Sequence, residues 1–296
     1  MREVLILSDR RMGHVNQSIA LAKYLNIPYE IAEVQFKNKL CKVLSYAFDK
    51  IGIRTSALFQ LKISKNYQIV IGTGSTTYYA AKVLAKKMQA KSITMMLPKG
   101  YGLEFDTIFA QSHDNPPRQK NIIEIPANFA YVEPEGIYRA SKKSIGIVIG
   151  GDNKIFKMSV EDLKKQLDFI KEYYEGYEFA ITTSPRTSDE VEKLVSSYHF
   201  NYEVIFSKNA INPIADFLEE CESVIITGDS TSMVSEAISY GEANVIVLPL
   251  ESTQDNKFVR FIDFLDKESY LHIFDGTIKN KNKKINFASY AQKVKS

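Results

Sequence analysis

The stretch that decides the fold class is residues 223–250, SVIITGDSTSMVSEAISYGEANVIVLPL. Its apolar, β-branched start, residues 224–227, has the length of one buried strand. A small polar loop then opens a helix whose apolar residues recur at spacings of three and four, and Gly241 ends that helix. Residues 245–248 form a second apolar strand. Strand, polar loop, helix and strand make a βαβ unit of a parallel sheet, in which ligands bind at the carboxyl ends of strands.

The polar loop of this unit suits an anion such as phosphate. It carries Asp229, Ser230, Thr231 and Ser232 and leads into a helix N-terminus, whose free amides attract negative charge. Hydroxyl side chains before a helix are often no more than caps, but three in a row exceed what one cap needs. Glu236 follows on the helix and is placed either to accept hydrogen bonds from a ribose diol or to complete a capping box.

The composition predicts an ordinary globular protein of two domains. The 296 residues are 45% hydrophobic and 25% charged. No apolar run approaches the roughly 20 residues of a membrane span, and the chain starts directly with a strand, so we expect no signal peptide. Cys41 and Cys221 lack the spacing of a metal site and predict buried thiols in a reducing, cytoplasmic compartment.

Positive charge is concentrated in the first half of the chain. Residues 1–140 carry 19 Lys and Arg against 11 Asp and Glu, whereas the formal net charge of the whole chain is only +3. This predicts an anionic partner or surface for that half, although a solvated Lys-rich face explains it as well. Residues 36–63 interleave lysines with aromatic and aliphatic residues, so we expect either docking on an anionic membrane surface or a helix packed on the sheet with a Lys fringe. We expect no nucleic-acid partner.

The first half repeats the pattern of a strand followed by a polar loop. The strand at residues 4–7 runs into a loop over residues 8–18, and we expect its helix to be marked from Ile19 onward. The strand at residues 68–71 runs into a second loop before a helix at residues 78–88. Neither loop has the G-x-G-x-x-G pattern of dinucleotide binding. The residues expected to line a site here are Asp9, Arg10, Gly13, His14, Asn16, Gln17, Gly74 and Ser75.

The second half starts after an aperiodic, proline-containing linker at residues 126–139. Its strand at residues 145–149 ends in a Gly-Gly-Asp-Asn loop at residues 150–153, and its strand at residues 177–182 ends in a Thr-Ser-Pro-Arg loop. The chain therefore predicts an α/β fold of two doubly wound Rossmann-like domains facing across a cleft. We expect domains at residues 1–140 and 141–275, and a tail at residues 276–296 that crosses back to the first domain or frays.

Four motifs, in this order, resemble the mitochondrial-fission ELM-like family, most of whose members are bacterial. They are SDR with GHVNQ within residues 8–17, GGD at residues 150–152, TTSPRT at residues 182–187 and TGDSTSMVSEA at residues 227–237. The resemblance spans nearly the whole chain. That family looks like a branch of the GT-B glycosyltransferases, whose C-terminal domain binds the nucleotide sugar and whose N-terminal domain binds the acceptor. The Gly13-His14 loop is also similar to the first, more glycine-rich loop of the lipid-linked N-acetylglucosaminyltransferase of peptidoglycan synthesis.

The resemblance implies a metal-independent glycosyltransferase without a cofactor. GT-B enzymes usually stabilise the departing nucleoside diphosphate with amides, hydroxyls and basic side chains, and the sequence has no Asp-x-Asp metal motif. On this hypothesis the hydroxyls of the polar loop hold the diphosphate with Arg186, and Glu236 takes the ribose hydroxyls. The donor-binding residues are then Gly150, Gly151, Asp152, Asn153, Thr183, Ser184, Arg186, Asp229, Ser230, Thr231, Ser232, Met233 and Glu236.

The resemblance also implies a role for the first domain, in which His14 or Asp9 is the candidate general base on the acceptor hydroxyl. The leading hypothesis is a cytoplasmic enzyme, possibly peripheral at the inner membrane face, that builds a bacterial surface glycan or extends a lipid-linked acceptor. The alternatives are a non-catalytic adaptor, as the family's fission name suggests, or a nucleotide-sugar epimerase or hydrolase on the same fold. The polar residues kept in the loops favour an enzyme, because an adaptor has no need of them.

Overall fold

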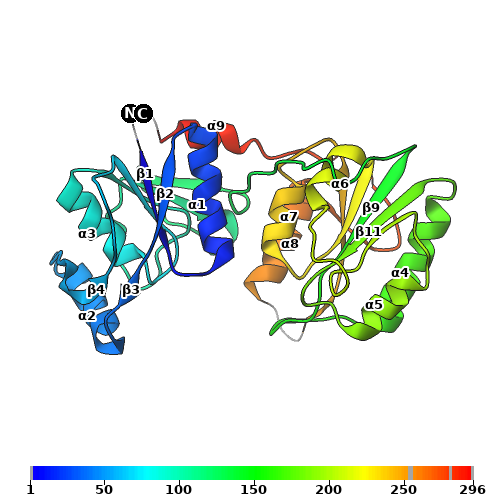
Figure 1. The fold of residues 1–296 in the computed structure, drawn as a ribbon, viewed down its shortest axis with the longest axis horizontal. Helices are drawn as coiled ribbons and strands as arrows, with labels where there is room; N and C mark the ends of the chain where they lie inside the picture. The colour runs from blue at the N-terminus through cyan, green and yellow to red at the C-terminus, as the bar shows by residue number, and fades with distance from the viewer. Residues whose placement is uncertain (1–2, 253–255, 280–281, 295–296) are drawn as a thin grey trace. The chain divides into compact units, whose positions relative to one another are not determined.

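A computed structural model describes residues 3–252, 256–279 and 282–294. The chain forms two compact units: the first spans the chain up to Tyr131 and again from Asn286 onward, and the second spans Val132–Ile285. Each unit contains a six-stranded parallel sheet with helices packed on both faces (Figure 1). The predicted fold class, two doubly wound Rossmann-like α/β domains of GT-B type, is confirmed.

The sheet of the first unit has the strand order β2-β1-β5-β6-β7-β8, and all its pairs are parallel. Its strands are β1 (Val4–Ser8), β2 (Tyr29–Glu33), β5 (Ile69–Gly72), β6 (Lys91–Thr94), β7 (Thr107–Gln111) and β8 (Ile122–Ile125). Helix α1 (Met12–Leu25) lies on one face and α3 (Tyr78–Met88) on the other (Figure 1). The C-terminal helix α9 (Phe287–Gln292) packs beside α1.

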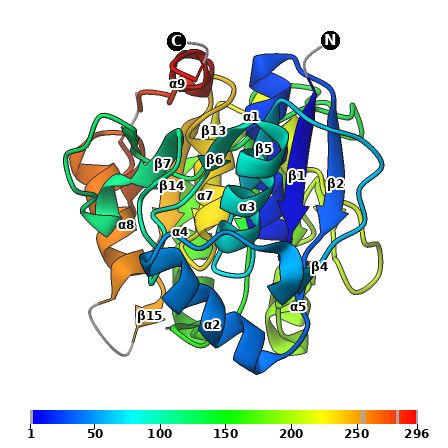
Figure 2. The same cartoon turned by 90° about the vertical axis from the view of Figure 1, so that its left-hand side faces the viewer.

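A small lobe is inserted in the chain between β2 and β5. Strand β3 (Gln35–Phe36) pairs antiparallel with β4 (Phe59–Gln60), and helix α2 (Lys39–Lys50) and the 3-10 turn η1 (Ser56–Leu58) lie between them. A second 3-10 turn, η2 (Ser112–Asp114), follows β7. Strands β1 and β2 point toward the side of the unit on which α2 lies (Figure 2). The carboxyl ends of the strands therefore open toward this lobe.

The sheet of the second unit has the strand order β12-β11-β9-β13-β14-β16, again all parallel. Its strands are β9 (Ser144–Ile149), β11 (Glu178–Thr183), β12 (Tyr202–Val204), β13 (Ser223–Thr227), β14 (Asn244–Leu248) and β16 (His272–Ile273). Helices α4 (Val160–Tyr173) and α5 (Asp189–Ser196) cover one face, and α6 (Ile214–Glu220), α7 (Thr231–Ala237) and α8 (Lys257–Lys267) lie on the other (Figure 1). Strands β10 (Phe156–Lys157) and β15 (Glu251–Ser252) form a separate antiparallel pair.

Alternation along β9 shows why an unbroken apolar run becomes a central strand. Ile145, Ile147 and Ile149 are fully buried in the core that contains α4 and α5. Gly146 faces the other side, where a Cβ would lie 2.9 Å from the Cβ of Phe217 on α6. Because successive side chains point to opposite faces, a strand covered by helices on both sides must be apolar at every position.

The division between the units falls before the predicted boundary at residue 140. Asp216 on α6 binds residues 132–140 to the second unit, because its carboxylate accepts hydrogen bonds from successive backbone amides. These belong to Glu135, Gly136, Ile137 and Tyr138, at 2.8–3.2 Å. Buried Asp216 therefore fixes the start of the second unit.

The predicted tail, residues 276–296, is divided between the units. Its part from Asn286 joins the first unit, where Phe287 stacks on Phe129 with ring centroids 4.6 Å apart. The preceding part stays with the second unit, where the Ile285 amide donates to the carbonyl of Ile238. Residues 280–281 and 295–296 lie outside the described residues. The described part of the tail thus returns to the first unit from Asn286 onward, where α9 lies.

Helix α1 begins at Met12, so the predicted loop over residues 8–18 is wrong in its second half. Val15 is buried on the first turns and extends the apolar face of the helix back from Leu21 and Leu25. Two polar residues on the same stretch, Gln17 and Ser18, are also buried, which hid this face in the sequence. The residues expected in a flexible loop are therefore held on a helix.

Candidate functional site

Each sheet has one point at which its strand order changes direction, between β1 and β5 in the first unit and between β9 and β13 in the second. Chain connections leave such a point in opposite directions, which leaves room for a ligand at the carboxyl ends of the two strands. The predicted residues of the first unit follow β1 and β5. Those of the second unit follow β9, β13 and the adjacent strand β11.

In the first unit the structure pairs Asp9 with His14. The Oδ2 atom of Asp9 lies 2.9 Å from Nδ1 of His14, and both side chains are largely shielded from solvent. The other carboxylate oxygen of Asp9 accepts the backbone amide of Arg11 at 3.1 Å. A carboxylate beside Nδ1 favours the tautomer with its proton on Nδ1, which leaves Nε2 as the proton acceptor. Of the two predicted bases, His14 is thus placed to accept a proton, and Asp9 is placed to orient the imidazole of His14.

Gly74, after β5, provides the space for this pair. Its φ of +94° lies in the left-handed region. A Cβ at this position would lie 2.5 Å from Nδ1 of His14 and 2.9 Å from Oδ2 of Asp9. Any side chain here would displace the imidazole, so the loop after β5 must carry glycine for the Asp9–His14 pair to form.

A hollow of about 460 Å³ opens beside Asp9. Its lining consists of Asp9, Arg10, Glu33, Val34, Gln35, Phe36, Asn38, Lys39, Lys42 and Thr76. Arg10 is paired with Glu33 at 2.7 Å, and Lys42 donates to the hydroxyl of Ser75 at 3.3 Å. Lys39 makes no ion pair with any residue that the structure describes. The hollow therefore places Asp9, the partner of His14, near the basic side chains of Lys39 and Lys42.

The remaining predicted residues of the first unit have structural positions. Gln17 is buried and bridges the carbonyl of Gly13 and the amide of Gln111. Gly13 is exposed on the first turn of α1, whereas the sequence predicted it in a loop. Asn16 is exposed on the same helix, and Arg10 adopts a left-handed backbone with φ of +67° at the turn before it.

In the second unit Asp229 is the centre of the polar cluster. Its fully buried carboxylate accepts hydrogen bonds from the Thr227 hydroxyl at 2.7 Å, the Gly151 amide at 3.2 Å and Nη2 of Arg186 at 2.6 Å. Burial raises the pKa of Asp229, while Thr227, Gly151 and Arg186 oppose this by stabilising its charged form. The cluster ties the loops after β9, β11 and β13 to one carboxylate.

Gly150 and Gly151 have packing roles in addition to the expected one of letting a donor approach, which stays a prediction. A Cβ at Gly150 would overlap the carboxylate of Asp229, and a Cβ at Gly151 would overlap the carbonyl of Arg186. Thr187 closes the same loop by donating its hydroxyl to the carbonyl of Gly150. The glycines therefore allow the three loops to meet, and this explains their presence without a ligand.

Asp152 and Asn153 are occupied by their own loop. Asp152 pairs with Lys157 at 2.9 Å and accepts the amide of Met158, and Lys157 lowers the pKa of that carboxyl. Asn153 accepts amides from the next turn and donates to the carbonyl of Asp229 at 3.1 Å. These bonds use the carbonyl oxygen and one N–H of the Asn153 amide, and the expectation that Asp152 or Asn153 reads a donor stays a prediction.

Thr183 and Ser184 hold the loop after β11. The buried hydroxyl of Thr183 donates to Glu192 at 3.0 Å, and the hydroxyl of Ser184 lies 3.2 Å from that of Thr187. The loop in turn presents Arg186, whose side chain remains 42% exposed although one nitrogen is bound to Asp229. The guanidinium thus keeps further donors in reach of solvent.

The loop after β13 caps the short helix α7. Ser230 is the N-cap, and its hydroxyl accepts the amide of Met233 at 3.4 Å. Thr231 and Ser232 occupy the first two helical positions, and both are partly exposed. One hydroxyl serves as the cap, so the other two are not needed for it.

Glu236 lies six residues after the N-cap, too far along α7 to form a capping box. Burial raises the pKa of its carboxyl to about 7. In the described ranges no side chain or amide donates a hydrogen bond to this carboxyl. Burial disfavours the charged form of this carboxyl, so the position favours an external hydrogen-bond donor.

Sequence reasoning missed several residues that complete these clusters. Thr227 and Thr187 carry hydrogen bonds of the Asp229 cluster, and they stood unremarked within recognised motifs. An apolar hollow of about 110 Å³ at the ends of β13 and β14 is lined by Phe156, Gly228, Val247, Pro249, Leu250, Val259, Ile262, Asp263 and Ile273. Within the described ranges, no group of three or more His, Cys, Asp or Glu is arranged to hold a metal ion.

One protein family matches nearly the whole chain. The profile of the family described as mitochondrial fission ELM1 matches residues 12–295. An uncharacterized protein of Rickettsia prowazekii (strain Madrid E) is 26% identical over 93% of this chain and 91% of its own.

Two solved structures share the fold. A candidate UDP-N-acetylglucosamine 2-epimerase from Listeria monocytogenes is 12% identical, with a TM-score of 0.52 over 99% of this chain and 87% of its own. Spinosyn forosaminyltransferase SpnP is 13% identical, with a TM-score of 0.50 over 95% and 87%. The fold is therefore one that nucleotide-sugar enzymes use.

Proposed function

This chain belongs to the mitochondrial fission ELM1 family, and we propose that it is a glycosyltransferase that uses a nucleotide-sugar donor without a metal ion. Two proteins of the same fold are named for chemistry on sugars, one of them on a UDP sugar. The observation that carries the proposal is the carboxyl of Glu236, largely buried and without a donor among the described residues. A ribose diol supplies two O–H donors and would satisfy it.

The donor's diphosphate is assigned to the loop between β13 and α7. Thr231 and Ser232 have hydroxyls beyond the cap, and the exposed part of the Arg186 guanidinium suits phosphate oxygens. These groups would stabilise the charge that develops on the leaving nucleoside diphosphate. Asp229 acts indirectly, because it holds Arg186 and the loop of Gly151 in place.

The acceptor is assigned to the first unit. His14 would take the proton from the attacking hydroxyl through Nε2, and Asp9 would stabilise the imidazolium that forms. The basic hollow beside Asp9 fits an acceptor that carries negative charge, such as a glycan attached to a lipid phosphate. The proposal places the reaction in the cytoplasm, the compartment that the unpaired Cys41 and Cys221 favour.

The proposal is tested by a thermal-shift screen of the purified protein with UDP, GDP, CDP, ADP, TDP and CMP, each with and without magnesium. A ligand that binds only the folded state raises the melting temperature by mass action. We expect one nucleoside diphosphate to raise it equally under both conditions. A shift that requires magnesium would contradict metal independence. An unchanged melting temperature with all six nucleotides would favour a non-catalytic adaptor.

A second measurement separates transfer from the other chemistry of this fold. The nucleotide sugar that corresponds to the active nucleotide is incubated with the protein, without acceptor, and the sugar products are followed. We expect little turnover, because transfer needs an acceptor hydroxyl. Rapid epimerisation or hydrolysis under these conditions would replace the glycosyltransferase by an epimerase or hydrolase.

A further inference from the structure

Helix α2 has two apolar faces, only one of which is covered. The inner face packs Leu44 and Phe48 against the core of the first unit. The outer face carries Leu40, Val43 and Ile51, which are 65%, 62% and 68% exposed. With exposed Ala47 these positions are spaced by three, four and four residues, so they form one stripe along the helix and its C-cap. Such a stripe is expected in a core and is unusual on a surface.

The exposed charges that α2 and its flanking residues carry beside this stripe are positive. Lys39 and Lys50 are exposed on the helix, and Lys37 is exposed just before it. The single acidic residue between Phe36 and Ile53 is Asp49, which is buried. The outer face of α2 therefore combines exposed aliphatic side chains with lysines and no exposed carboxylate.

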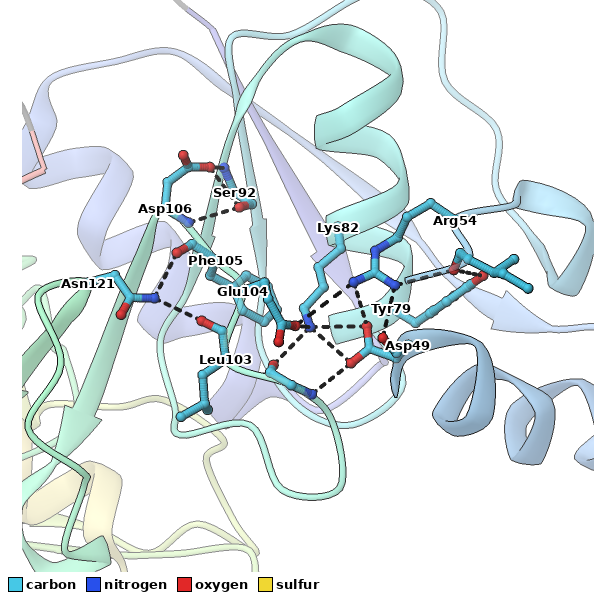
Figure 3. Close-up of polar contacts among 12 residues, drawn as sticks. Asp49, Arg54, Tyr79, Lys82, Ser92, Leu103, Glu104, Phe105, Asp106 and Asn121 are labelled. Carbon is cyan, nitrogen blue, oxygen red and sulfur yellow. Dashed lines mark hydrogen bonds and ion pairs between the residues drawn. The ribbon is translucent and has the colours of Figure 1, made fainter. Parts of the chain in front are cut away.

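A buried ionic cluster fixes the orientation of α2 (Figure 3). The carboxylate of Asp49 accepts two hydrogen bonds from Nζ of Lys82 on α3, both at 3.0 Å, and one from the amide of Gly102 at 2.7 Å. Nη2 of Arg54 lies 3.3 Å from the same carboxylate, and Glu104 pairs with Lys82 at 2.8 Å. Because these contacts end on Asp49 at the C-terminal turn, α2 cannot roll its aliphatic stripe inward.

The exposed face of α4 in the second unit shows what an ordinary solvated helix of this protein looks like. Its outer side carries ion pairs between Lys164 and Asp168 at 2.6 Å and between Lys165 and Glu161 at 2.8 Å. Mixed charges are typical of a face in contact with water. The outer face of α2 departs from this pattern in both polarity and charge.

We propose that the outer face of α2, formed by Leu40, Val43, Ala47 and Ile51 with Lys39 and Lys50, docks the first unit on an anionic lipid bilayer. Aliphatic side chains enter the acyl boundary while lysines contact the lipid phosphates. A second copy of this chain fits less well, since a self-pairing of this face brings like charges together. The inference goes beyond the proposed function and does not depend on it.

The docking has a consequence for the hollow beside Asp9. Lys39 and Lys42 lie on α2 and also line that hollow, so a docked α2 brings its mouth close to the lipid headgroups. An acceptor anchored in the bilayer would then reach the Asp9–His14 pair without leaving the membrane.

The proposal is tested by flotation of the full chain with vesicles of phosphatidylcholine alone and with 30% phosphatidylglycerol. Each lysine near an anionic surface contributes about 1 kcal/mol, so we expect at least about tenfold stronger binding to the anionic vesicles. Binding should fall when sodium chloride is raised to about 0.5 M, because salt screens the charges. Equal partitioning onto both vesicle types, or none onto either, would overturn the proposal.

Two variants locate the binding on α2. Leu40→Ser with Val43→Ser should weaken binding to anionic vesicles about tenfold or more. Ile211→Ser with Tyr173→Ser, which removes exposed apolar side chains of the second unit, should leave it unchanged. Since all four side chains are exposed, circular dichroism and melting temperature should match the wild type for both variants. Equal binding by the α2 variant and the wild type would contradict the assignment.

A measurement of mass in solution excludes the competing occupant. We expect the wild type and the Leu40→Ser, Val43→Ser variant to show the same mass by light scattering across a concentration series. A dimer of the wild type that this variant abolishes would assign the face to a second copy and overturn the membrane assignment.

Discussion

The two switch points of this molecule use the same construction for different chemistry. In both units a carboxylate sits at the carboxyl end of the sheet against a glycine: Asp9 against Gly74, and Asp229 against Gly150. In the first unit the carboxylate binds an imidazole, His14, at 2.9 Å. In the second it binds a guanidinium, Arg186, at 2.6 Å. An imidazole can exchange a proton near neutral pH, whereas a guanidinium stays charged.

On our proposal this difference divides the chemistry between the two units. The first unit would move a proton, and the second would hold an anion with a cation that stays charged. No helix among the described residues is long and apolar enough to cross a membrane. The position of the two carboxylates in the fold is the same, so only their different partners, His14 and Arg186, distinguish the two proposed roles.

The strongest test of the comparison is His14→Gln. Loss of a general base lowers turnover by about 10²- to 10⁴-fold, and we expect this for transfer from the nucleotide sugar that the screen identifies. The affinity for the nucleotide should stay within about twofold, because His14 belongs to the other unit. His199→Gln, at an exposed histidine of the second unit, is the control and should keep full activity. Wild-type turnover of His14→Gln would show that His14 is not the general base.

The two glycines should respond differently to alanine. At Gly150 the new Cβ meets a carboxylate fixed by three donors, so overpacking should lower the free energy of unfolding by about 1–3 kcal/mol. At Gly74 the new Cβ meets His14, whose side chain can rotate away. Turnover should therefore fall strongly, while stability should fall only by the strain of a positive φ. Gly52→Ala, with φ of +76° and open space, measures that strain alone. Denaturant unfolding and turnover measurements check this prediction. Equal losses of stability and of turnover in Gly150→Ala and Gly74→Ala would contradict it.

Arg186→Ala should weaken nucleotide binding by about 1–3 kcal/mol, as for loss of a charge-assisted hydrogen bond. It should also lower stability, because the buried carboxylate of Asp229 loses its cation. Adding Asp229→Asn should recover part of that stability and none of the affinity. Lys157→Ala breaks the exposed pair with Asp152 and should change stability by no more than about 1 kcal/mol. Calorimetry of these three variants separates the effects, and an unchanged affinity in Arg186→Ala would show that Arg186 does not contact the nucleotide.

The smallest expected effect is a pH dependence from Glu236. Burial raises its pKa to about 7 in the free protein, so stability from this group is fullest below its unfolded pKa and falls as pH rises through about 7. A ribose diol donates to the charged form and lowers that pKa. Nucleotide affinity should therefore rise about tenfold from pH 6 to pH 8. Glu236→Gln should lose this difference between the two pH values, and retention of the full difference would assign it to the phosphates.

The sequence predicted the sheets well because their strands are buried on both faces. Strands β9, β13 and β14 read as continuous apolar runs, and each was expected within a few residues. The edge strand β2 was not recognised, since most of its residues are exposed and no apolar run marks it. The short strand β16 and helix α8 were missed as well, which left the far edge of the second sheet undescribed.

The site was predictable as a set of loops but not as a set of contacts. Spacing indicated that the loops after β9, β11 and β13 would meet, because parallel strands end at one edge. Nothing in the sequence indicated that Asp229 would bind Arg186, or that Asn153 would donate to the carbonyl of Asp229, since both depend on side-chain directions across different loops. The same holds for the link from Asp49 to Lys82, which is set by how α2 packs on α3.

The most direct test of the division of chemistry is calorimetric titration, at pH 8, of the identified nucleoside diphosphate into the wild type, Glu236→Ala and His14→Gln. We expect Glu236→Ala to bind about tenfold or more weakly with a melting temperature within a few degrees of the wild type, and His14→Gln to bind normally. A normal affinity for Glu236→Ala together with a loss in His14→Gln would place the nucleotide on the first unit and contradict the assignment.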